Sequence, residues 1–341
     1  MSTVAKWTLD PAYMARLKAT AEHTAVVRKC PKTDTEIVIS YQTFGSSENP
    51  CVLLVMGLNG QAPLWDIEFC EAVADKGYYV VRYDNRDVGL STKLDKCGSP
   101  GLFTLLTKGC CCGTTPYLLI DIAADGIALL DHLHIDKAHI VGVSMGGMLV
   151  QTMAIEFPHR VASMTSIAST TGGPKQVDPN LSMKLFLAKK PKSNSDEHLS
   201  EFRIDFVKRT GGPRPFDENK CFTRGIYLSH RSRYVDGAFR HAGAIVFSPS
   251  RVEGLGKLKM PVLVIHGDKD ELVPTANGYQ THEAIPGSRL VIIPNMGHIL
   301  FDEDIETIAS EIDAVAKRGS ANVDTTKPVN QLPVTPNEPV A

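Results

Sequence analysis

Long apolar runs are missing from this sequence of 341 residues. No stretch approaches the roughly 18 apolar residues that a membrane-spanning helix needs. The N-terminal stretch MSTVAKWTLDPAYMARLKAT is polar and lacks the apolar centre of a signal peptide, and neither end of the chain carries a lipidation motif or a peroxisomal address. The sequence therefore predicts a cytoplasmic protein without a transmembrane segment.

A surplus of charge of either sign is also missing. Lysine and arginine together number 36, aspartate and glutamate 38, and no basic stripe stands out, so the formal net charge is only −2. This balance excludes nucleic acid as an expected partner. Hydrophobic residues make up 43% and charged residues 22%, as in ordinary soluble proteins, and the length suffices for one large domain or two smaller ones.

Eight cysteines are present, but without an export signal we expect reduced thiols rather than a disulfide framework. Three of them are consecutive in the segment TKGCCCGTT (107–115). Either S-acylation of Cys110, Cys111 or Cys112, beside Lys108, provides weak and reversible membrane association, or these thiols are incidental to a loop. A metal site is disfavoured, because adjacent cysteines cannot all converge on one ion.

Strand-like and helix-like segments alternate along most of the chain. The pattern predicts strands at 35–45, 51–56, 78–84, 138–143, 161–168, 261–267 and 289–295, and helices at 9–22, 65–76, 117–134, 145–157 and 302–317. Such alternation is typical of an α/β protein with a mostly parallel sheet and helices on both faces.

Two segments break this rhythm. Residues 171–255 are rich in Gly, Pro, Lys and Arg, yet carry leucines and aromatics at helical spacing, which predicts a helical cap inserted over one edge of the sheet. Residues 318–341 contain several prolines and no aromatic side chain, which predicts a disordered tail. The expected core therefore comprises residues 1–170 and 256–317.

A G-x-S-x-G pattern lies where the strand at 138–143 meets the following helix, in the sequence HIVGVSMGGMLVQTMAIEFP (139–158). Ser144 stands at the bend, between Gly142 and Gly146. A serine at such a strand-to-helix turn projects its hydroxyl above the carboxyl edge of the sheet, in a strained backbone conformation. This context makes Ser144 a candidate nucleophile.

A serine hydroxyl needs a base, and the base needs an acid that orients it. The strand VLVIHG is followed by a turn with Asp268 and Asp270, and the strand LVIIPN by a turn with His298. The order Ser, acid, His and the position of both turns after parallel strands place all three groups at one edge of the sheet. His298 is the expected base, and either aspartate could orient it.

The segment LLVMGLNG follows the strand at 51–56 and ends in a turn. A backbone N–H of Leu58 in this turn could pair with that of Met145 at the start of the helix after Ser144. Two such donors would form an oxyanion hole. The segment also reads as an ordinary turn, because Gly57, Asn59 and Gly60 favour one.

These stretches, together with VVRYDNRDVGLST and IPNMGHIL, resemble the α/β-hydrolase fold superfamily over residues 35–315. Within it the chain is most similar to small-ester hydrolases of the aclacinomycin methylesterase group. The resemblance implies a triad of Ser144, Asp270 and His298, with Asp270 favoured over Asp268, and oxyanion donors at Leu58 and Met145. It also implies that Asp84 and Arg86 hold a loop. Two positions depart from the usual pattern, because Met56 replaces a histidine and Asp87 a glycine.

The resemblance implies a serine esterase that is lipase-like, needs no metal or organic cofactor and acts on a small-molecule ester with an apolar acyl or alcohol part. A serine nucleophile argues against epoxide hydrolase and haloalkane dehalogenase activity. Two alternatives remain open. An aminopeptidase or amidase of the prolyl-iminopeptidase type would need acidic groups such as Glu201, Asp236 or Glu253 at its pocket. A ligand receptor with slow turnover could use the same fold.

Overall fold

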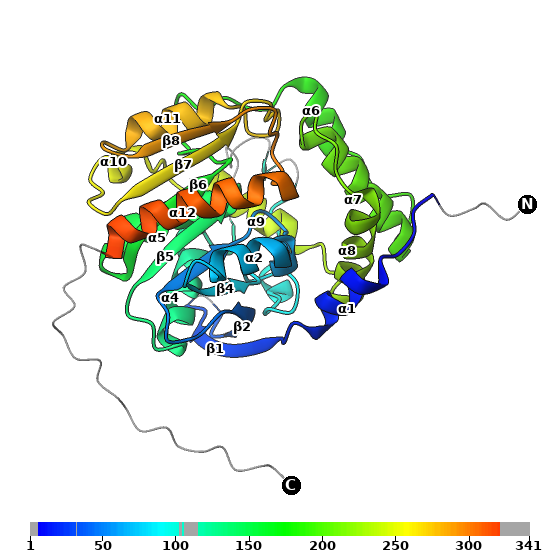
Figure 1. Ribbon diagram of the computed structural model, residues 1–341, viewed down its shortest axis with the longest axis horizontal. Coiled ribbons are helices and arrows are strands. Elements are labelled where there is room, and N and C mark those ends of the chain that lie inside the picture. The colour runs from blue at the N-terminus through cyan, green and yellow to red at the C-terminus, as the bar shows by residue number, and fades with distance from the viewer. Residues whose placement is uncertain (1–5, 32, 102–103, 106–114, 321–341) are drawn as a thin grey trace, which may run out of the picture.

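The computed structural model describes residues 6–31, 33–101, 104–105 and 115–320 (Figure 1). The expectation of lipidation at Cys110, Cys111 or Cys112 lies outside these residues. So does the expectation of a disordered tail, except at its start, because residues 318–320 belong to the last helix, α12 (Ile305–Ser320).

The centre of the molecule is a sheet of eight strands within the described residues. Its order is β1-β2-β4-β3-β5-β6-β7-β8, and only the pairs formed by β2 are antiparallel. The strands are β1 (His23–Lys29), β2 (Glu36–Phe44), β3 (Cys51–Val55), β4 (Tyr79–Tyr83), β5 (Ala138–Val143), β6 (Val161–Ile167), β7 (Val262–Gly267) and β8 (Arg289–Ile293). The mostly parallel sheet confirms the predicted fold class.

Helices cover both faces of this sheet. The helices α4 (Leu119–His132), α5 (Met145–Glu156) and α11 (Ala276–Ala284) lie on one face, and α2 (Ile67–Ala74) and α12 on the other (Figure 1). Every residue of β3, β5, β6 and β7 is buried. This explains the nearly continuous apolar sequences of β3, β5 and β7, because a parallel strand covered on both faces has no solvent side. Strand β6 also buries Ser163, Thr165 and Ser166.

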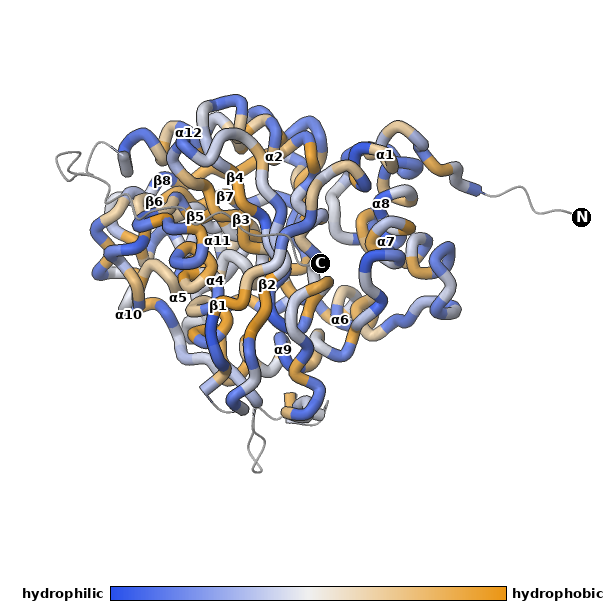
Figure 2. The backbone as a smooth tube through the Cα atoms, turned by 90° about the horizontal axis from the view of Figure 1, so that it is seen from below, coloured by the Kyte–Doolittle hydropathy of each residue, from blue (hydrophilic) through white to orange (hydrophobic). Residues whose placement is uncertain are grey.

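Residues 171–255, for which the sequence predicts a helical cap, contain five helices separated by loops. They are α6 (Leu181–Leu187), α7 (Asp196–Thr210), α8 (Glu218–Arg231), α9 (Gly237–Phe247) and α10 (Val252–Leu255). Figure 2 shows α6, α7 and α8 beside the sheet layer rather than on it. On α6 the side chains of Met183 and Phe186 are buried, whereas Leu181 and Leu185 are 71% and 64% exposed. The apolar spacing therefore marks only one packed face of this helix.

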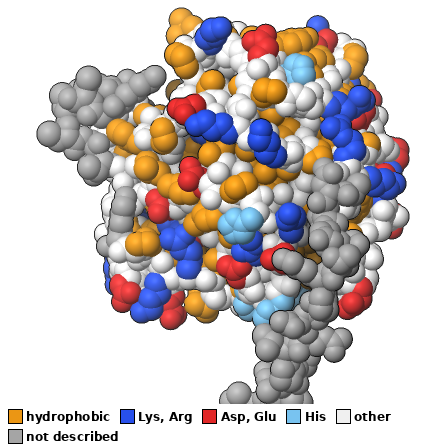
Figure 3. Space-filling view, turned by 90° about the vertical axis from the view of Figure 1, so that its left-hand side faces the viewer, with side chains coloured by type: hydrophobic (Ala, Val, Ile, Leu, Met, Phe, Trp, Pro, Cys, Tyr) orange, Lys and Arg blue, Asp and Glu red, His pale blue; other side chains and the backbone are white. Residues whose placement is uncertain are grey.

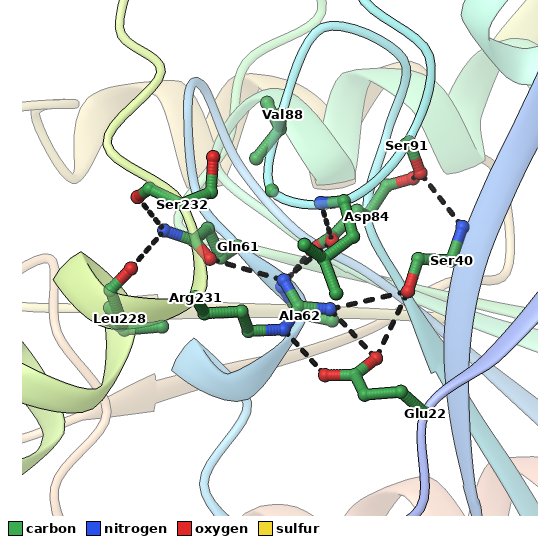
Figure 4. A network of polar contacts seen from close by, with 12 residues as sticks. Glu22, Ser40, Gln61, Ala62, Asp84, Val88, Ser91, Leu228, Arg231 and Ser232 are labelled. Carbon is green, nitrogen blue, oxygen red and sulfur yellow. Dashed lines mark hydrogen bonds and ion pairs between the residues drawn. The ribbon is translucent and has the colours of Figure 1, made fainter.

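The cap is fixed to the core by a network around Arg231, at the end of α8 (Figure 4). The Arg231 guanidinium donates to the carboxylates of Glu22 and Asp84, 2.5 and 2.6 Å away, and to Gln61 at 3.1 Å. The Gln61 amide donates in turn to the carbonyl oxygens of Leu228 and Ser232. Because Asp84 is fully buried, its carboxylate is stable there only with such partners.

The N-terminal segment packs against this cap. Trp7 stacks on Phe222 of α8 with ring centroids 5.9 Å apart, and its indole N–H donates to Glu218. The helix α1 (Pro11–Ala19) contacts α8, while its Tyr13 hydroxyl donates to Asp66 at the start of α2. Residues 7–19, expected within the core, therefore bridge the core and the cap.

Candidate active site

Ser144 occupies a strained turn between β5 and α5. Its φ is 59° and its ψ −122°, a conformation that L-residues other than glycine rarely adopt. Two hydrogen bonds fix the turn, one from the Ser144 N–H to the Ile167 carbonyl at 2.9 Å and one from the Ser169 hydroxyl to the Ser144 carbonyl at 2.7 Å. The side chain is half-buried. A strained and doubly anchored serine of this kind is typical of a nucleophile elbow.

The glycines on either side of Ser144 are needed because backbone passes close to both. A Cβ atom on Gly142 would lie 2.1 Å from the carbonyl oxygen of Gly146, and one on Gly146 would lie 2.0 Å from that of Val55 in β3. Side chains at these positions would therefore separate α5 from the sheet. The spacing of the motif follows from this contact.

The structure brings Asp270 and His298 together. The Nδ1–H of His298 donates to Oδ2 of Asp270 at 2.8 Å, and Oδ1 of Asp270 accepts the N–H groups of Leu272 and Val273. Burial raises the pKa of Asp270, but its electrostatic and hydrogen-bond interactions with His298 and His266 outweigh this effect and hold the pKa below its usual range. Asp270 is therefore an ionised carboxylate that fixes the orientation of the imidazole.

Asp268, the other candidate acid, has a different task. Its Oδ1 accepts the N–H of Asn295 at 2.6 Å, which ties the turn after β7 to the turn after β8. It shares no hydrogen bond with His298 among the described residues. Between the two aspartates, the geometry thus favours Asp270 as the partner of the imidazole.

The loop after β3 lies directly beside Ser144. A Cβ atom on Gly57 would be 3.1 Å from the Cβ of Ser144. On the other side of Ser144, the first return hydrogen bond of α5 is from the Met148 N–H to the Ser144 carbonyl, so the N–H of Met145 is left unused by the helix. Leu58 and Met145, the expected oxyanion donors, thus lie on the two backbone segments that flank Ser144.

The described residues show no hydrogen bond between the Ser144 hydroxyl and His298, and no protein partner for Nε2 of the imidazole. Hydrogen bonds of this kind are often long before a substrate binds. The main-chain N–H of His298 donates to the Thr210 carbonyl at the end of α7, so the cap holds the loop that carries the imidazole.

The α/β-hydrolase fold family matches residues 50–305, which include the elbow, both turns and the cap. This chain belongs to the α/β-hydrolase fold family. It is 28% identical over 290 residues to rhodomycin D methylesterase DnrP of Streptomyces peucetius, covering 79% of this chain and 91% of that protein. It is 26% identical over 297 residues to 3-oxoadipate enol-lactonase 2 of Acinetobacter baylyi, covering 84% and 96%.

A solved structure of a thermophilic esterase from Thermogutta terrifontis has the same fold as this α/β-hydrolase. The TM-score is 0.60 at 20% identity, with 87% of this chain and 97% of that chain covered. At this identity the likeness concerns the fold alone. The methylesterase similarity agrees with the group that the sequence motifs indicate.

In this α/β-hydrolase the side chains of Asp84 and Arg86 hold the loops around the site in place. The Arg86 guanidinium makes a bidentate ion pair with Asp125 at 2.5 and 2.6 Å, fully buried. The Asp84 carboxylate accepts the N–H groups of Ala62 and Leu90. These contacts agree with the loop-holding role that the resemblance implies for Asp84 and Arg86.

The sequence did not predict three side-chain contacts near the site, which are made by His266, Arg240 and His241. His266 of β7 lies 3.4 Å from Oδ2 of Asp270. Arg240 and His241 of α9 reach from the cap into the loops after β3 and β4. No local pattern marks such long-range partners, although His266 could have been noticed because it precedes the G-x-x-D turn.

Two of the three acidic groups that an aminopeptidase could use are paired with lysines away from the candidate triad. Glu253 is exposed and pairs with Lys257 at 2.5 Å, and Glu201 pairs with Lys192 at 3.4 Å. Asp236 is the residue before α9. None of the three shares a hydrogen bond with Ser144, Asp270 or His298 in the part of the chain that the structure describes.

A cavity of about 520 Å³ opens at the opposite edge of the sheet, where β6 and β7 begin. Its lining includes Ile155, Val161, Gly254, Lys257 and Met260, and none of the candidate catalytic residues. The helix α10, which carries Gly254, lies on the left of Figure 1, the side that Figure 3 shows with apolar side chains scattered among both signs of charge. This cavity is separate from the candidate active site.

The described residues lack two features, a cluster of metal ligands and a membrane-spanning helix. They contain no group of three or more His, Cys, Asp or Glu side chains placed to hold a metal ion. In the same part of the chain, every helix is too short or too polar to cross a membrane.

Proposed function

We propose that this α/β-hydrolase cleaves carboxylic esters through an acyl-enzyme formed on Ser144. The observation that supports this most is the hydrogen bond from His298 to the buried Asp270 carboxylate, on turns that open at the same sheet edge as the strained Ser144. A nucleophile, a base and an orienting acid are what acyl transfer by a serine requires.

In the proposed mechanism, His298 takes the proton from the Ser144 hydroxyl as the oxygen attacks the ester carbonyl. Asp270 keeps Nδ1 protonated, so Nε2 carries the lone pair that accepts this proton, and its charge then stabilises the imidazolium. The imidazolium returns the proton to the departing alcohol. Water attacks the acyl-enzyme by the same route in reverse, which releases the acid and restores the serine.

The oxyanion of both tetrahedral intermediates would be bound by the N–H groups of Leu58 and Met145. The Met145 donor stands at the N-terminus of α5, where the helix dipole also favours negative charge. Because these donors are backbone groups, their positions depend on the loops and not on side-chain rotamers.

For the substrate we propose an ester with an apolar acyl or alcohol part. The relatives are a rhodomycin D methylesterase and an enol-lactonase, which by their names act on a methyl ester and an enol lactone. Leu58 follows Gly57, which lies against Ser144, and is 42% exposed, so the loop beside the proposed site of attack carries an accessible apolar side chain. We propose the cytoplasm as location, since the thiols of Cys51, Cys70, Cys97 and Cys221 form no disulfides.

The test compares the wild-type protein with Ser144→Ala on p-nitrophenyl esters of graded acyl length, together with labelling by a fluorophosphonate. We expect multiple turnover and labelling in the wild type, and loss of both in the variant. Turnover that persists in Ser144→Ala would rule the proposal out. A wild type that binds esters or hormones tightly without turning them over would instead support the receptor alternative.

A further inference from the structure

The loop between β3 and α2, residues 56–62, carries the proposed oxyanion donor Leu58 and is held by side chains from two directions. From the core, the Asn85 amide donates to the Met56 carbonyl at 3.0 Å, and Asp84 accepts the Ala62 N–H at 2.7 Å. From the cap, His241 of α9 accepts the N–H of Asn59 at 3.3 Å. Asn59, with φ at 54°, is the strained residue of this loop.

His241 is fully buried, and its two ring nitrogens have distinct partners. Nε2 lies 2.9 Å from the carbonyl oxygen of Arg86. Because a carbonyl can only accept, Nε2 carries the hydrogen, and Nδ1 has the lone pair that receives the Asn59 N–H. Burial lowers the pKa of His241 to about 4, so the imidazole stays neutral near pH 7. One tautomer thus links the loop after β3 to the loop after β4.

The neighbouring residue makes a separate attachment to the core. Arg240 forms a buried bidentate pair with Asp87, its Nε and Nη2 donating at 2.9 and 2.8 Å. Docking of α9 therefore has its own strong contact. The hydrogen bond from the Asn59 N–H to His241 has a different effect, because it restrains a main-chain group one residue from the proposed oxyanion donor.

We propose that His241 is a positioning residue for the oxyanion hole, acting through the peptide between Leu58 and Asn59. The proposal rests on the function proposed above. With the Asn59 N–H bound to His241, rotation of the Leu58–Asn59 peptide is restrained, and this restraint also limits the movement of Leu58, whose neighbour Gly57 lies against Ser144. Donors that are fixed in advance are what make an oxyanion hole effective.

Three substitutions separate this role from simple packing. In His241→Asn the side-chain oxygen takes the place of Nδ1 and can still accept from Asn59. In His241→Gln the amide N–H takes the place of Nε2 and can still donate to Arg86, while the acceptor for Asn59 is lost. His241→Ala removes both. Phe239→Ala, at a 48% exposed position of the same helix, is the control.

We expect kcat to fall on the order of 10- to 100-fold in His241→Ala and His241→Gln, because a donor displaced by about 1 Å costs that much. KM should change little, since the substrate's ground state does not need the oxyanion hole. His241→Asn and Phe239→Ala should stay within a few-fold of the wild type. An asparagine variant as slow as the alanine variant, or a glutamine variant as fast as the wild type, would overturn the proposal.

Amide hydrogen exchange of the peptide spanning residues 57–62 gives a readout that needs no activity. Exchange should accelerate in His241→Ala and His241→Gln and stay slow in His241→Asn, with thermal unfolding showing that every variant is folded. If the wild type hydrolysed no ester, the proposed function would fail, but the exchange would still test whether His241 fixes the loop. Unchanged exchange in His241→Ala would refute that.

Discussion

At the scale of single residues, Asp268 and Asp270 stand two positions apart and have separate partners. Asp270 accepts from the His298 imidazole, while Asp268 accepts from the Asn295 main chain. An asparagine at 268 retains an oxygen that can accept the same bond. An asparagine at 270 lacks the charge that stabilises a protonated imidazole and can favour the wrong tautomer.

Asp270→Asn should therefore lower kcat on the order of 10,000-fold with little change in KM. Asp268→Asn, its matched control in the same turn, should stay within a few-fold of the wild type. Steady-state kinetics on one p-nitrophenyl ester suffice for both. Equal losses in the two variants would show that the turn as a whole, rather than the Asp270 charge, supports activity.

The elbow glycines allow a prediction on stability. Gly146→Ala places a Cβ atom 2.0 Å from the Val55 carbonyl oxygen, and neither β3 nor α5 can yield without opening the core. We expect the free energy of unfolding to drop by about 3 kcal/mol or more. Gly101→Ala, where a Cβ atom would meet none of the described residues within 4 Å, should change it by less than about 0.5 kcal/mol. Urea denaturation measures both, and a fully stable Gly146→Ala would contradict the contact.

The candidate triad could be predicted from the sequence because each member follows a strand and sits in a recognisable turn. Ser144 has its glycines, and Asp270 and His298 follow the apolar strands β7 and β8. His241 could not be predicted, because its partners lie 155 and 182 positions away and nothing around it is periodic. The sequence places a residue on an element, whereas packing decides which distant backbone group it meets.

At the scale of elements, the helix α9 is attached to the loop after β4 through the carboxylate of Asp87, a charge that the usual family pattern lacks. Asp87, where a glycine is common, has φ at 65° and a carboxylate buried against Arg240. The Tyr117 hydroxyl and the Leu94 N–H complete the coordination of this carboxylate. These bonds and the Arg240 charge outweigh the effect of burial, which raises the pKa of Asp87, and hold that pKa below its usual range.

Removing only Arg240 from its ion pair with Asp87 should lower the free energy of unfolding more than removing both charged side chains. Arg240→Ala leaves the Asp87 charge buried and unpaired, and we expect a loss of about 3 to 5 kcal/mol in unfolding free energy. In the double variant Asp87→Gly, Arg240→Ala the charge is gone and glycine suits the positive φ, so part of this stability should return. Urea denaturation of both variants decides the point. A double variant less stable than Arg240→Ala would show that Asp87 stabilises the loop without Arg240.

Strand β5 was predicted at its observed bounds, because it is buried and every residue except His139 is apolar. Strand β1 was missed. It pairs only with β2 at the edge of the sheet, and its burial pattern leaves charged residues such as Arg28 and Lys29 partly or fully exposed. Partial burial removes the apolar signature on which the prediction of strands depends.

At the scale of the whole molecule, two buried histidines should make stability depend on pH. Burial lowers the pKa of His241 and of His139 to about 4 each. His139 lies at the start of β5 near Ser163, and His241 faces the charges of Arg86, Asp87 and Arg240. Unfolded histidine has a pKa of about 6.5, so between pH 6.5 and 4 the unfolded chain binds protons that the folded chain does not.

The free energy of unfolding should therefore fall as the pH is lowered through this window, by about 2 kcal/mol for each histidine at pH 5. In His241→Asn one of the two contributions is absent, so the loss between pH 7 and pH 5 should be about 2 kcal/mol smaller. His159→Asn, at an exposed position, is the control and should keep the wild-type dependence. Urea denaturation at the two pH values measures the difference. An equal loss in His241→Asn and the wild type would show that His241 is protonated equally in the folded and unfolded chains. That result would contradict the neutral, doubly hydrogen-bonded tautomer.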